Sequence, residues 1–394
     1  MANIKKQPSN PTDAGEVIAS NYDLTSQILL RLPSRSVDNL RHTSKQWCSI
    51  SSDPYFITSH IRDNPPLLSG FFLHYFERPR ALSHEYVAVE SIEKTTVGSS
   101  LQFVEAQNSL DLHILQSCNG LLLCSLDTKY YICNPTTLQR KQIPLPKSWL
   151  TFGTYALNLA YDPKQSRHYK VVYVRKFYGL QPKYQIEVYS SETGYWNTSG
   201  EPFIEENDID FKHGVFCKGA IHWLKQTSSC LYFDINQGCL KSTPEPPRTK
   251  QFDTTECEYF GQSNGHLYLV VRRHLPNFML YQMEDDYSGW SLKCVVDLDV
   301  LATNFPSMAR NFYNTSVFSR IYECNVLCVV ENGNEVDEIG HVNLVVSIPG
   351  EILYFNPLTK ASKKIAQLRI SPFDESVWFR DFILHEYFET ICPV

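Results

Sequence analysis

The feature that most constrains this chain is a long succession of short apolar runs after residue 69. Each run has four to six residues, and Gly, Pro, Asn and Asp separate the runs, which is typical of strands joined by turns. Clear examples are residues 121–124, 169–174, 266–271, 326–330 and 342–346. About 325 residues contain no helical stripe of useful length. The region is therefore predicted to be all-β, and it is too long for a simple β-sandwich.

A weak internal repeat supports this prediction. In four segments an apolar strand ends, a short polar residue follows, and a second strand begins after the turn. The polar residue is Asn, Ser or Asp, whose side chain can bond the backbone of the turn. The four anchor residues are Asn134, Ser190, Asp234 and Asn356. They are separated by 56, 44 and 122 residues, and the last interval can hold one more unit near residues 281–285 and another near residue 322.

Repeats of this length, with several strands each, predict a β-propeller. About 325 residues correspond to roughly six to eight blades. Each blade has a sheet face that only its neighbours cover, and an aromatic content of 13%, with 23 Tyr and 22 Phe, suits such faces. A stacked pair of β-sandwiches is the second architecture that the pattern allows.

The beginning of the chain has a different pattern. Residues 1–19 are polar and are predicted to be a disordered tail, and residues 20–62 are predicted to form a small helical module. A stiff, proline-containing linker at residues 63–69 leads to the β domain, residues 70–394. A module of about 40 residues has little core of its own, so it needs a partner surface or a neighbouring domain.

Three helices are expected in this module. The first has an apolar stripe and stops at Pro33. Ser36 is expected to cap a second helix, and Asp53 and Pro54 form a turn before a short third one. The stripe of the first helix consists of Leu24, Ile28, Leu29 and Leu32, and that of the second consists of Val37, Leu40, Trp47 and Ile50.

Composition excludes several classes of function. The net charge is −6, with the first 69 residues near neutral, and nucleic-acid binding that is independent of sequence needs clustered Lys and Arg. No segment offers about 18 uninterrupted apolar residues, so no membrane span is expected. The 12 cysteines include no CxxC pair, so we expect buried reduced thiols, no metal site and no cofactor. Reduced thiols favour a reducing compartment, the cytoplasm and/or the nucleus.

Two parts of the chain resemble known families. Residues 24–57 resemble the F-box, through Leu24–Pro33, Leu40–Trp47 and Asp53–Ile57. The β region resembles the F-box-associated, kelch-like region of plant F-box proteins, through residues 117–122, 134–137, 161–163, 169–172, 187–196 and 219–224. The resemblance implies a mostly β fold, in which a small N-terminal α-helical F-box precedes a large kelch-like β-propeller.

The resemblance also implies a function. Such a protein is the substrate-recognition subunit of an SCF-type (Skp–cullin–F-box) ubiquitin ligase. Its F-box docks on a Skp-type adaptor and through it on a cullin, and its β domain captures a target protein, here unidentified. Ubiquitin transfer falls to other subunits, so no catalytic residues are expected. The resemblance places the adaptor contacts at Leu24, Ile28, Leu32, Pro33, Leu40 and Trp47, and plain packing within the module is the alternative for each of them.

Two other functions remain open. F-boxes commonly open with Leu-Pro where this chain has Asn21 and Tyr22, which is compatible with a scaffold or inhibitor outside a functional ligase. A propeller enzyme acting on a small molecule would need a central pocket of converging polar groups. The sequence contains no P-loop, HExxH or GxGxxG motif that would support an enzyme.

Three features of the β region could carry chemistry. Cys118 precedes Asn119 and Gly120, and we interpret these residues as a turn into a buried strand. His222 lies between two apolar residues and is interpreted as a structural histidine at the edge of a blade. Acidic residues gather at Glu201, Glu205, Glu206, Asp208 and Asp210, and at Glu331, Glu335, Asp337 and Glu338. Both sets lack the ligand spacing of a calcium loop and are interpreted as solvated loops.

Overall fold

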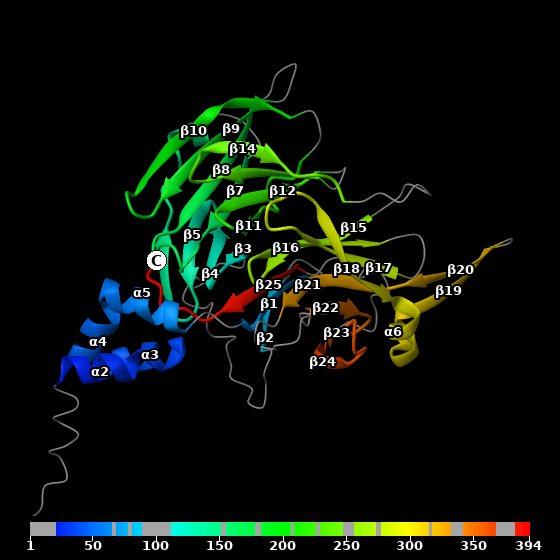
Figure 1. Cartoon of the computed structure of the whole chain (residues 1–394), viewed down its shortest axis with the longest axis horizontal. Helices are drawn as coiled ribbons and strands as arrows, with labels where there is room; N and C mark the ends of the chain where they lie inside the picture. Colours follow the sequence, from blue (N-terminus) through cyan, green and yellow to red (C-terminus); the bar gives the residue numbers. More distant parts are fainter. Residues whose placement is uncertain are drawn as a thin grey trace, which may run out of the picture.

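The computed structural model describes residues 21–64, 68–77, 81–88, 112–150, 155–177, 183–205, 209–225, 229–246, 256–272, 277–314, 317–331, 342–367 and 383–394. The tail predicted at residues 1–19 lies outside these ranges. Over the described residues, a group of helices lies beside a ring of antiparallel sheets (Figure 1).

Four short helices form the N-terminal module: α2 (Tyr22–Leu29), α3 (Ser34–Arg41), α4 (Lys45–Ser52) and α5 (Pro54–Asp63). Asn21 begins α2, because its side chain accepts a hydrogen bond from the Leu24 amide at 3.1 Å. Asp53 begins α5 in the same way and accepts from the amides of Tyr55 and Phe56 at 2.8 and 3.1 Å. These caps satisfy amides that have no acceptor within their own helix.

The second expected helix is in fact two helices. Ser36 does not cap it, because α3 already begins at Ser34, directly after Pro33. The proline ring fixes φ near the value that a helix start needs, so the helix begins three residues earlier than expected. The chain then turns, and Trp47 belongs to α4 rather than to the helix that contains Leu40.

Five four-stranded antiparallel blades follow. Blade 1 consists of β3 (Leu112–Cys118), β4 (Leu121–Leu126), β5 (Lys129–Asn134) and β6 (Gln139–Gln142). Blade 2 consists of β7 (Tyr155–Ala160), β8 (Lys170–Phe177), β9 (Lys183–Ser190) and β10 (Tyr195–Ile204). Blade 3 consists of β11 (Val215–Cys217), β12 (Ala220–Leu224), β13 (Cys230–Asp234) and β14 (Cys239–Ser242). Blade 4 consists of β15 (Glu256–Ser263), β16 (His266–Arg272), β17 (Asn277–Met283) and β18 (Trp290–Asp297), and blade 5 of β21 (Asn325–Glu331), β22 (Val342–Ile348), β23 (Glu351–Phe355) and β24 (Ser362–Gln367).

A three-stranded sheet fills the remaining place in the ring. Its strands are β1 (Leu68–Glu77), β2 (Ala81–Ala88) and β25 (Ile383–Phe388), in the order β2-β1-β25. The first strands of the blades contact one another in the order β3, β7, β11, β15 and β21, and β25 then contacts both β21 and β3. The strand β25 therefore closes the ring, and strands from both ends of the β region form the closing sheet.

Buried apolar side chains between neighbouring sheets hold the ring together. Six separate hydrophobic clusters are present among the described residues, and each joins two neighbouring sheets. The cluster between blades 2 and 3, for example, contains Val172 and Ile186 from one blade and Trp223 and Phe233 from the other. This arrangement confirms the predicted propeller and excludes the stacked β-sandwiches. The expected number of six to eight blades is wrong, because the described part of the ring has five blades and the three-stranded closing sheet.

The repeated turn is confirmed at all four predicted anchors. Asp234 accepts hydrogen bonds from two amides of its turn, at 3.0 and 2.9 Å, and Asn356 does the same at 3.0 and 2.8 Å. Asn134 accepts at 2.8 and 3.3 Å, and Ser190 accepts one bond at 3.3 Å. Asn134, Ser190 and Asp234 each end the third strand of their blade, and Asn356 directly follows it.

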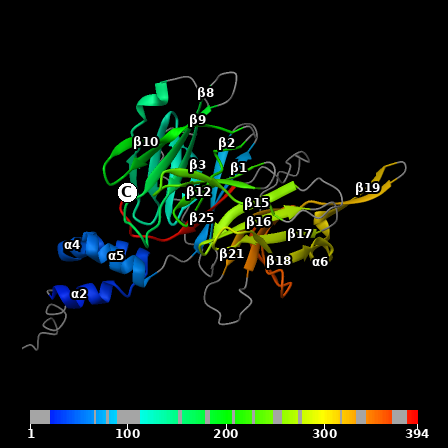
Figure 2. The same ribbon diagram turned by 45° about the horizontal axis from the view of Figure 1, so that its top comes forward.

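The long interval after Asp234 holds blade 4 and an insertion. The strand β17 of blade 4 contains the unit expected near residues 281–285. The unit expected near residue 322 is not a blade. That residue ends a two-stranded hairpin of β19 (Ala309–Asn314) and β20 (Val317–Tyr322), which follows α6 (Leu298–Asn304) and the short helix η3 (Pro306–Met308). The hairpin projects from the side of the ring that is opposite the N-terminal helices α2–α5 (Figures 1 and 2).

Candidate functional site

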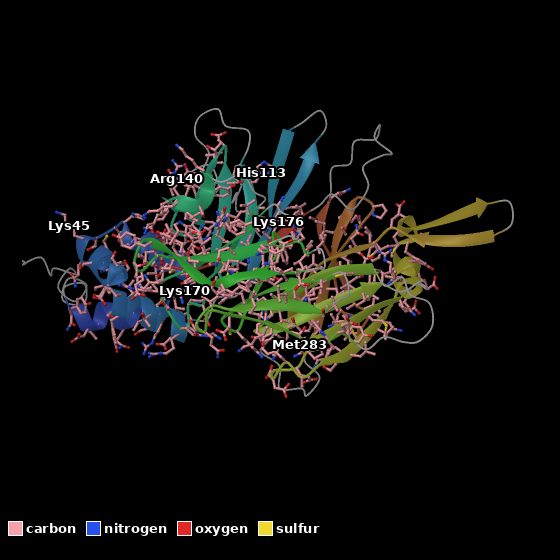
Figure 3. The ribbon with its side chains drawn as sticks, turned by 90° about the horizontal axis from the view of Figure 1, so that it is seen from above. Lys45, His113, Arg140, Lys170, Lys176 and Met283 are labelled. Atoms are coloured by element: carbon pink, nitrogen blue, oxygen red, sulfur yellow. The ribbon has the colours of Figure 1, made fainter. Side chains whose placement is uncertain are left out.

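The first helix of the module presents apolar side chains to solvent. Leu24 and Ile28 keep 48% and 47% of their surface exposed, and Tyr22 keeps 51%. Leu24 and Ile28 are one helical turn apart, so they lie on the same face of α2. On the same module, Lys45 at the start of α4 lies at the outer end of the molecule, away from Lys176 and Met283 on the sheets (Figure 3).

Contacts from α5 fix the end of α2. The His60 Nε2 donates to the carbonyl of Leu32 at 2.8 Å, and the Asn64 side chain donates to the carbonyl of Leu30 at 2.7 Å. Burial lowers the pKa of His60, so the ring is held in its neutral form. The carbonyls of the turn that follows α2 therefore have fixed partners, which hold the end of the helix in place.

The six predicted adaptor contacts fall into two groups. Leu24, Ile28 and Pro33 are exposed. Leu32, Leu40 and Trp47 are half-buried and pack against the core of the module. The apolar stripe expected on α2 is also divided, because Leu29 is buried at 1% exposure while its neighbour Ile28 faces solvent. The structure thus separates residues free for contact from residues that also support the fold, and adaptor binding by all six stays a prediction.

Two exposed aromatic residues extend the apolar surface of the module. Tyr22 is the first residue of α2, and Tyr55, with 81% exposure, is in the first turn of α5. Sequence reasoning did not assign either residue to a binding surface. Tyr22 gives a signal in the sequence, because it is an aromatic residue at the start of a helix. Tyr55 gives none, because it is adjacent to Phe56 and the sequence does not show that Phe56 is the buried residue of the two.

The module is attached to the propeller by polar and apolar contacts. The Arg35 Nε in α3 lies 2.8 Å from the Glu389 Oε1, and the Arg35 Nη2 donates to the Tyr387 hydroxyl at 3.2 Å. Buried side chains of the helices and of blades 1 and 2 form one hydrophobic cluster, which also includes Ile391 and Cys392. Two views place the C-terminal residue beside the helices (Figures 1 and 2).

Cys118 is confirmed as a residue of a turn into a buried strand. Its thiol donates to the carbonyl of Tyr161 at 3.4 Å, and burial raises its pKa to about 12. A thiol with this pKa is almost fully protonated near neutral pH and is a poor nucleophile. Asn119 and Gly120 form the turn with positive φ values of 46° and 92°. All 12 cysteines of the chain are free thiols in the structure.

His222 is a structural histidine, although it does not lie at a blade edge. It belongs to β12, the second strand of blade 3, and is fully buried. Its Nδ1 faces the carbonyl of Val215 at 3.3 Å, and its Nε2 lies 3.0 Å from the Tyr287 hydroxyl. Its ring stacks on those of Tyr232 and Tyr287, and burial lowers its pKa to about 4. These contacts join blades 3 and 4.

The acidic residues expected in solvated loops lie partly in strands. Glu201 belongs to β10, and Glu331 ends β21, where its Oε2 lies 3.0 Å from the His266 Nδ1. Glu205 lies 3.1 Å from the Lys225 Nζ, and Asp210 lies 2.7 Å from the His213 Nδ1. Their neighbours Glu206 and Asp208, like Glu335, Asp337 and Glu338, lie outside the described residues. Across the described part of the chain, no three His, Cys, Asp or Glu side chains gather in a way that could hold a metal ion. Nor does any helix there have the length and apolar character needed to cross a membrane.

One carboxyl group in the ring was not singled out from the sequence. Glu386 lies in the ring-closing strand β25, and the residue as a whole keeps partial exposure. Burial of its carboxyl group raises the pKa to about 8. The charge of Glu386 in turn helps to raise the pKa of the Tyr259 hydroxyl and of the Cys328 and Cys118 thiols, whose burial is the larger cause. We assign it no catalytic role.

Comparison with known proteins gives the family of this chain. Residues 21–59 match the F-box domain family, and residues 82–270 match the family described as F-box associated beta propeller domain. The F-box protein At5g07610 of Arabidopsis thaliana is 34% identical over 388 residues, which cover 91% of this chain and 88% of that protein. The F-box/LRR-repeat/kelch-repeat protein At2g27520 of the same plant is 27% identical over 57% of this chain and 60% of its own length.

Solved structures resemble the chain only weakly. The oligogalacturonate lyase of Vibrio parahaemolyticus has a TM-score of 0.36 at 10% identity, over 64% of each chain, which supports no inference about function. The two domain matches, the extended match to the Arabidopsis protein and the order of helices and blades agree with one another. The chain therefore belongs to the plant F-box proteins that carry an F-box associated β-propeller domain.

Proposed function

We propose that this protein is the substrate-recognition subunit of a Skp–cullin–F-box ubiquitin ligase. The F-box docks on a Skp-type adaptor and through it on a cullin, and the propeller captures a target protein for ubiquitination. The observation that carries the proposal is the exposed apolar face of α2, formed by Leu24 and Ile28. Such a face on a folded helix favours a protein partner that covers it.

The exposed side chains of this face can contribute to docking. Burying an aliphatic side chain contributes about 1.5–3 kcal/mol before the costs of association are subtracted. Leu24 and Ile28 are half-exposed and therefore still have about half of this contribution to gain in a complex. Tyr22 stands where other F-boxes commonly have proline, and its ring is exposed at the start of α2.

Target capture belongs, in this proposal, to the end of the ring that carries the connections between blades. In each blade the strands alternate in direction, so the turn after the third strand and the connection to the next blade lie at opposite ends. The turn of blade 1 contacts the segment that reaches the F-box. The connections, which include α6 and the hairpin β19–β20, are therefore farther from the F-box, and loops on a rigid scaffold commonly carry binding residues.

The remaining parts of the proposal concern catalysis and the cellular compartment. A receptor subunit brings target and adaptor together and leaves ubiquitin transfer to other subunits, so the chain is proposed to be non-catalytic. Its free thiols support a reducing compartment, the cytoplasm and/or the nucleus.

The test is a binding titration of the full-length protein with a purified Skp-type adaptor. Leu24→Asp should weaken binding by roughly ten- to a hundredfold, because a carboxylate would be desolvated in the interface without a partner. The control is Leu358→Asp on blade 5, since Leu358 is 47% exposed, close to the 48% of Leu24. The control should bind as the wild type does. Unchanged binding of Leu24→Asp would remove α2 from the docking surface, and a wild-type protein that does not bind the adaptor would refute the ligase role.

A further inference from the structure

The segment Glu389–Val394, which follows the ring-closing strand, is packed like a core element. Thr390, Ile391 and Cys392 have exposed fractions of 2%, 4% and 0%. Ile391 and Cys392 belong to the same hydrophobic cluster as Leu29 of the F-box and as the core between blades 1 and 2. The segment therefore shares one core with the F-box and the propeller.

Arg35 connects the F-box to this segment and to the ring-closing strand. Its Nε lies 2.8 Å from the Glu389 Oε1, and its Nη2 donates to the hydroxyl of Tyr387, a fully buried residue of β25. The Arg35 side chain is 38% exposed and that of Glu389 24% exposed, so the pair is partly shielded from solvent. Tyr387 and Glu389 therefore lie beside Arg35 only when β25 is in the ring.

Blade 1 holds the segment through Asn134. The side-chain Nδ2 donates to the carbonyls of Thr390 and Cys392 at 2.9 and 2.7 Å. Its Oδ1 faces the other way and accepts from the amides of the blade 1 turn. Next to it, the Thr136 Oγ1 accepts from the Thr390 amide at 3.1 Å and lies 3.0 Å from the Tyr387 hydroxyl.

The equivalent turn of blade 5 provides a comparison. Asn356 also caps its turn through Oδ1, but its Nδ2 donates to the side chain of Asn343 within the same blade. The position equivalent to Thr136 is Leu358, which is exposed. The asparagine of the blade 1 turn thus caps its own turn, as the asparagine of blade 5 does. It also binds the segment that reaches the F-box.

Gly120 provides the room for this segment. A Cβ atom at this position would lie 2.6 Å from the Thr390 Cγ2 and 2.7 Å from the carbonyl oxygen of Phe388. Its φ of +92° is also one that other residues rarely adopt. The hairpin between β3 and β4 is therefore shaped to let the segment pass closely over it.

From these contacts we propose that docking of the F-box onto its own propeller is conditional on closure of the propeller ring. Insertion of β25 between β21 and β3 brings Tyr387 and Glu389 to Arg35 in the same step that completes the ring. The F-box comes first in the chain, and its anchors come after all five blades. Without those anchors, the F-box depends on a small core of its own, which is insufficient for a module of this size. If the F-box binds an adaptor as proposed above, this contact also couples adaptor binding to a complete propeller.

The test is hydrogen exchange on the full-length protein, with Asn134→Asp compared with Asn356→Asp. Aspartate keeps the oxygen that caps the turn but loses the donor that binds Thr390 and Cys392. Among the described residues, the side chain of Asn134 bonds Thr390, Cys392 and its own turn rather than the F-box. We expect the amides of α2–α5 to exchange roughly five- to thirtyfold faster in Asn134→Asp, and to stay within about twofold of the wild type in Asn356→Asp.

Two outcomes would overturn the proposal. One is exchange of the F-box amides at the wild-type rate in Asn134→Asp, and the other is equal acceleration in both variants. If Asn134→Asp also unfolds β4 and β5, Thr136→Val decides instead, because it removes the hydroxyl that binds the segment and leaves the turn-capping residue intact. Wild-type exchange of the F-box in a folded Thr136→Val protein then overturns the proposal.

The exchange experiment is independent of the proposed ligase role, because it uses the free protein without adaptor. A parallel titration with the purified Skp-type adaptor separates the two questions. A wild-type protein that does not bind the adaptor refutes the ligase role, while faster exchange in Asn134→Asp still supports docking conditional on ring closure. Adaptor binding by the wild type together with unchanged exchange refutes only the conditional docking.

Discussion

The F-box and the propeller use apolar side chains in opposite ways. In the propeller, six hydrophobic clusters lie between neighbouring sheets, so each blade is covered by the next. In the F-box, Leu24 and Ile28 remain half-exposed on α2, and the buried residues share their cluster with the propeller. The closed ring is covered by its own parts, whereas the F-box depends on its neighbour and, in the proposed complex, on a partner.

This difference implies that the same chemical change has different consequences in the two regions. A defect in the ring acts on a surface that two sheets share, so its effect is large and reaches the neighbouring blade. A defect in the F-box acts on a small module, so its effect is smaller in energy but extends over all four helices. Substitutions matched between the two regions test this contrast.

The largest expected effect is that of a core tryptophan in the ring. Trp223 is fully buried between blades 2 and 3, and its Nε1 donates to the carbonyl of Phe211 at 3.1 Å. Trp223→Ala should lower the free energy of unfolding of the propeller by about 3–5 kcal/mol. Trp47→Ala should cost less, because Trp47 is only half-buried. Urea unfolding followed by circular dichroism measures both, and an equal loss in the two variants would contradict the contrast.

A smaller effect, dependent on pH, is expected at Glu386. Burial raises its pKa to about 8, so the folded protein keeps the proton over a pH range in which the unfolded chain has lost it. Stability from this group is complete below about pH 4.5 and decreases as the pH rises toward 8. Glu386→Gln removes this dependence and should raise the free energy of unfolding at pH 8, relative to wild type, by about 2–4 kcal/mol.

The control for this prediction is Glu284→Gln, since Glu284 is exposed in the turn between β17 and β18. Its unfolding free energy should follow that of the wild type at every pH. Urea midpoints between pH 5 and pH 8 give the comparison. A difference between Glu386→Gln and wild type that is the same at pH 5 and pH 8 would exclude a titrating carboxyl group as its cause.

The sequence alone predicted those features of the fold that depend on short-range chemistry. Asp234 and Asn356 bond amides two and three residues further on, so the turn is encoded within four residues. The family resemblance then supplied the order of F-box and propeller. The stripe on α2 was predicted only in part, because periodicity marks apolar residues without showing that Leu29 is buried and Ile28 is exposed.

The attachment of the F-box could not be predicted in this way. Arg35 and Tyr387 are separated by 352 positions, and neither belongs to a pattern that names the other. The pKa of Glu386 also depends on the surrounding ring, not on its neighbours in the sequence. Contacts of this kind result from ring closure, which brings the two ends of the β region together after the local elements are defined.

The smallest expected effect is the loss of a cap, and it tests how far a local defect spreads. Asp53 and Asp234 each accept hydrogen bonds from two amides, one pair beginning α5 and the other closing the turn of blade 3. Asp53→Ala should cost about 1 kcal/mol and speed hydrogen exchange across α2–α5, because His60 and Asn64 of α5 hold the end of α2. Asp234→Ala should speed exchange only near the turn between β13 and β14, because neighbouring blades cover the rest. If acceleration in Asp53→Ala is confined to the first turn of α5, the F-box is not the single cooperative unit that this contrast requires.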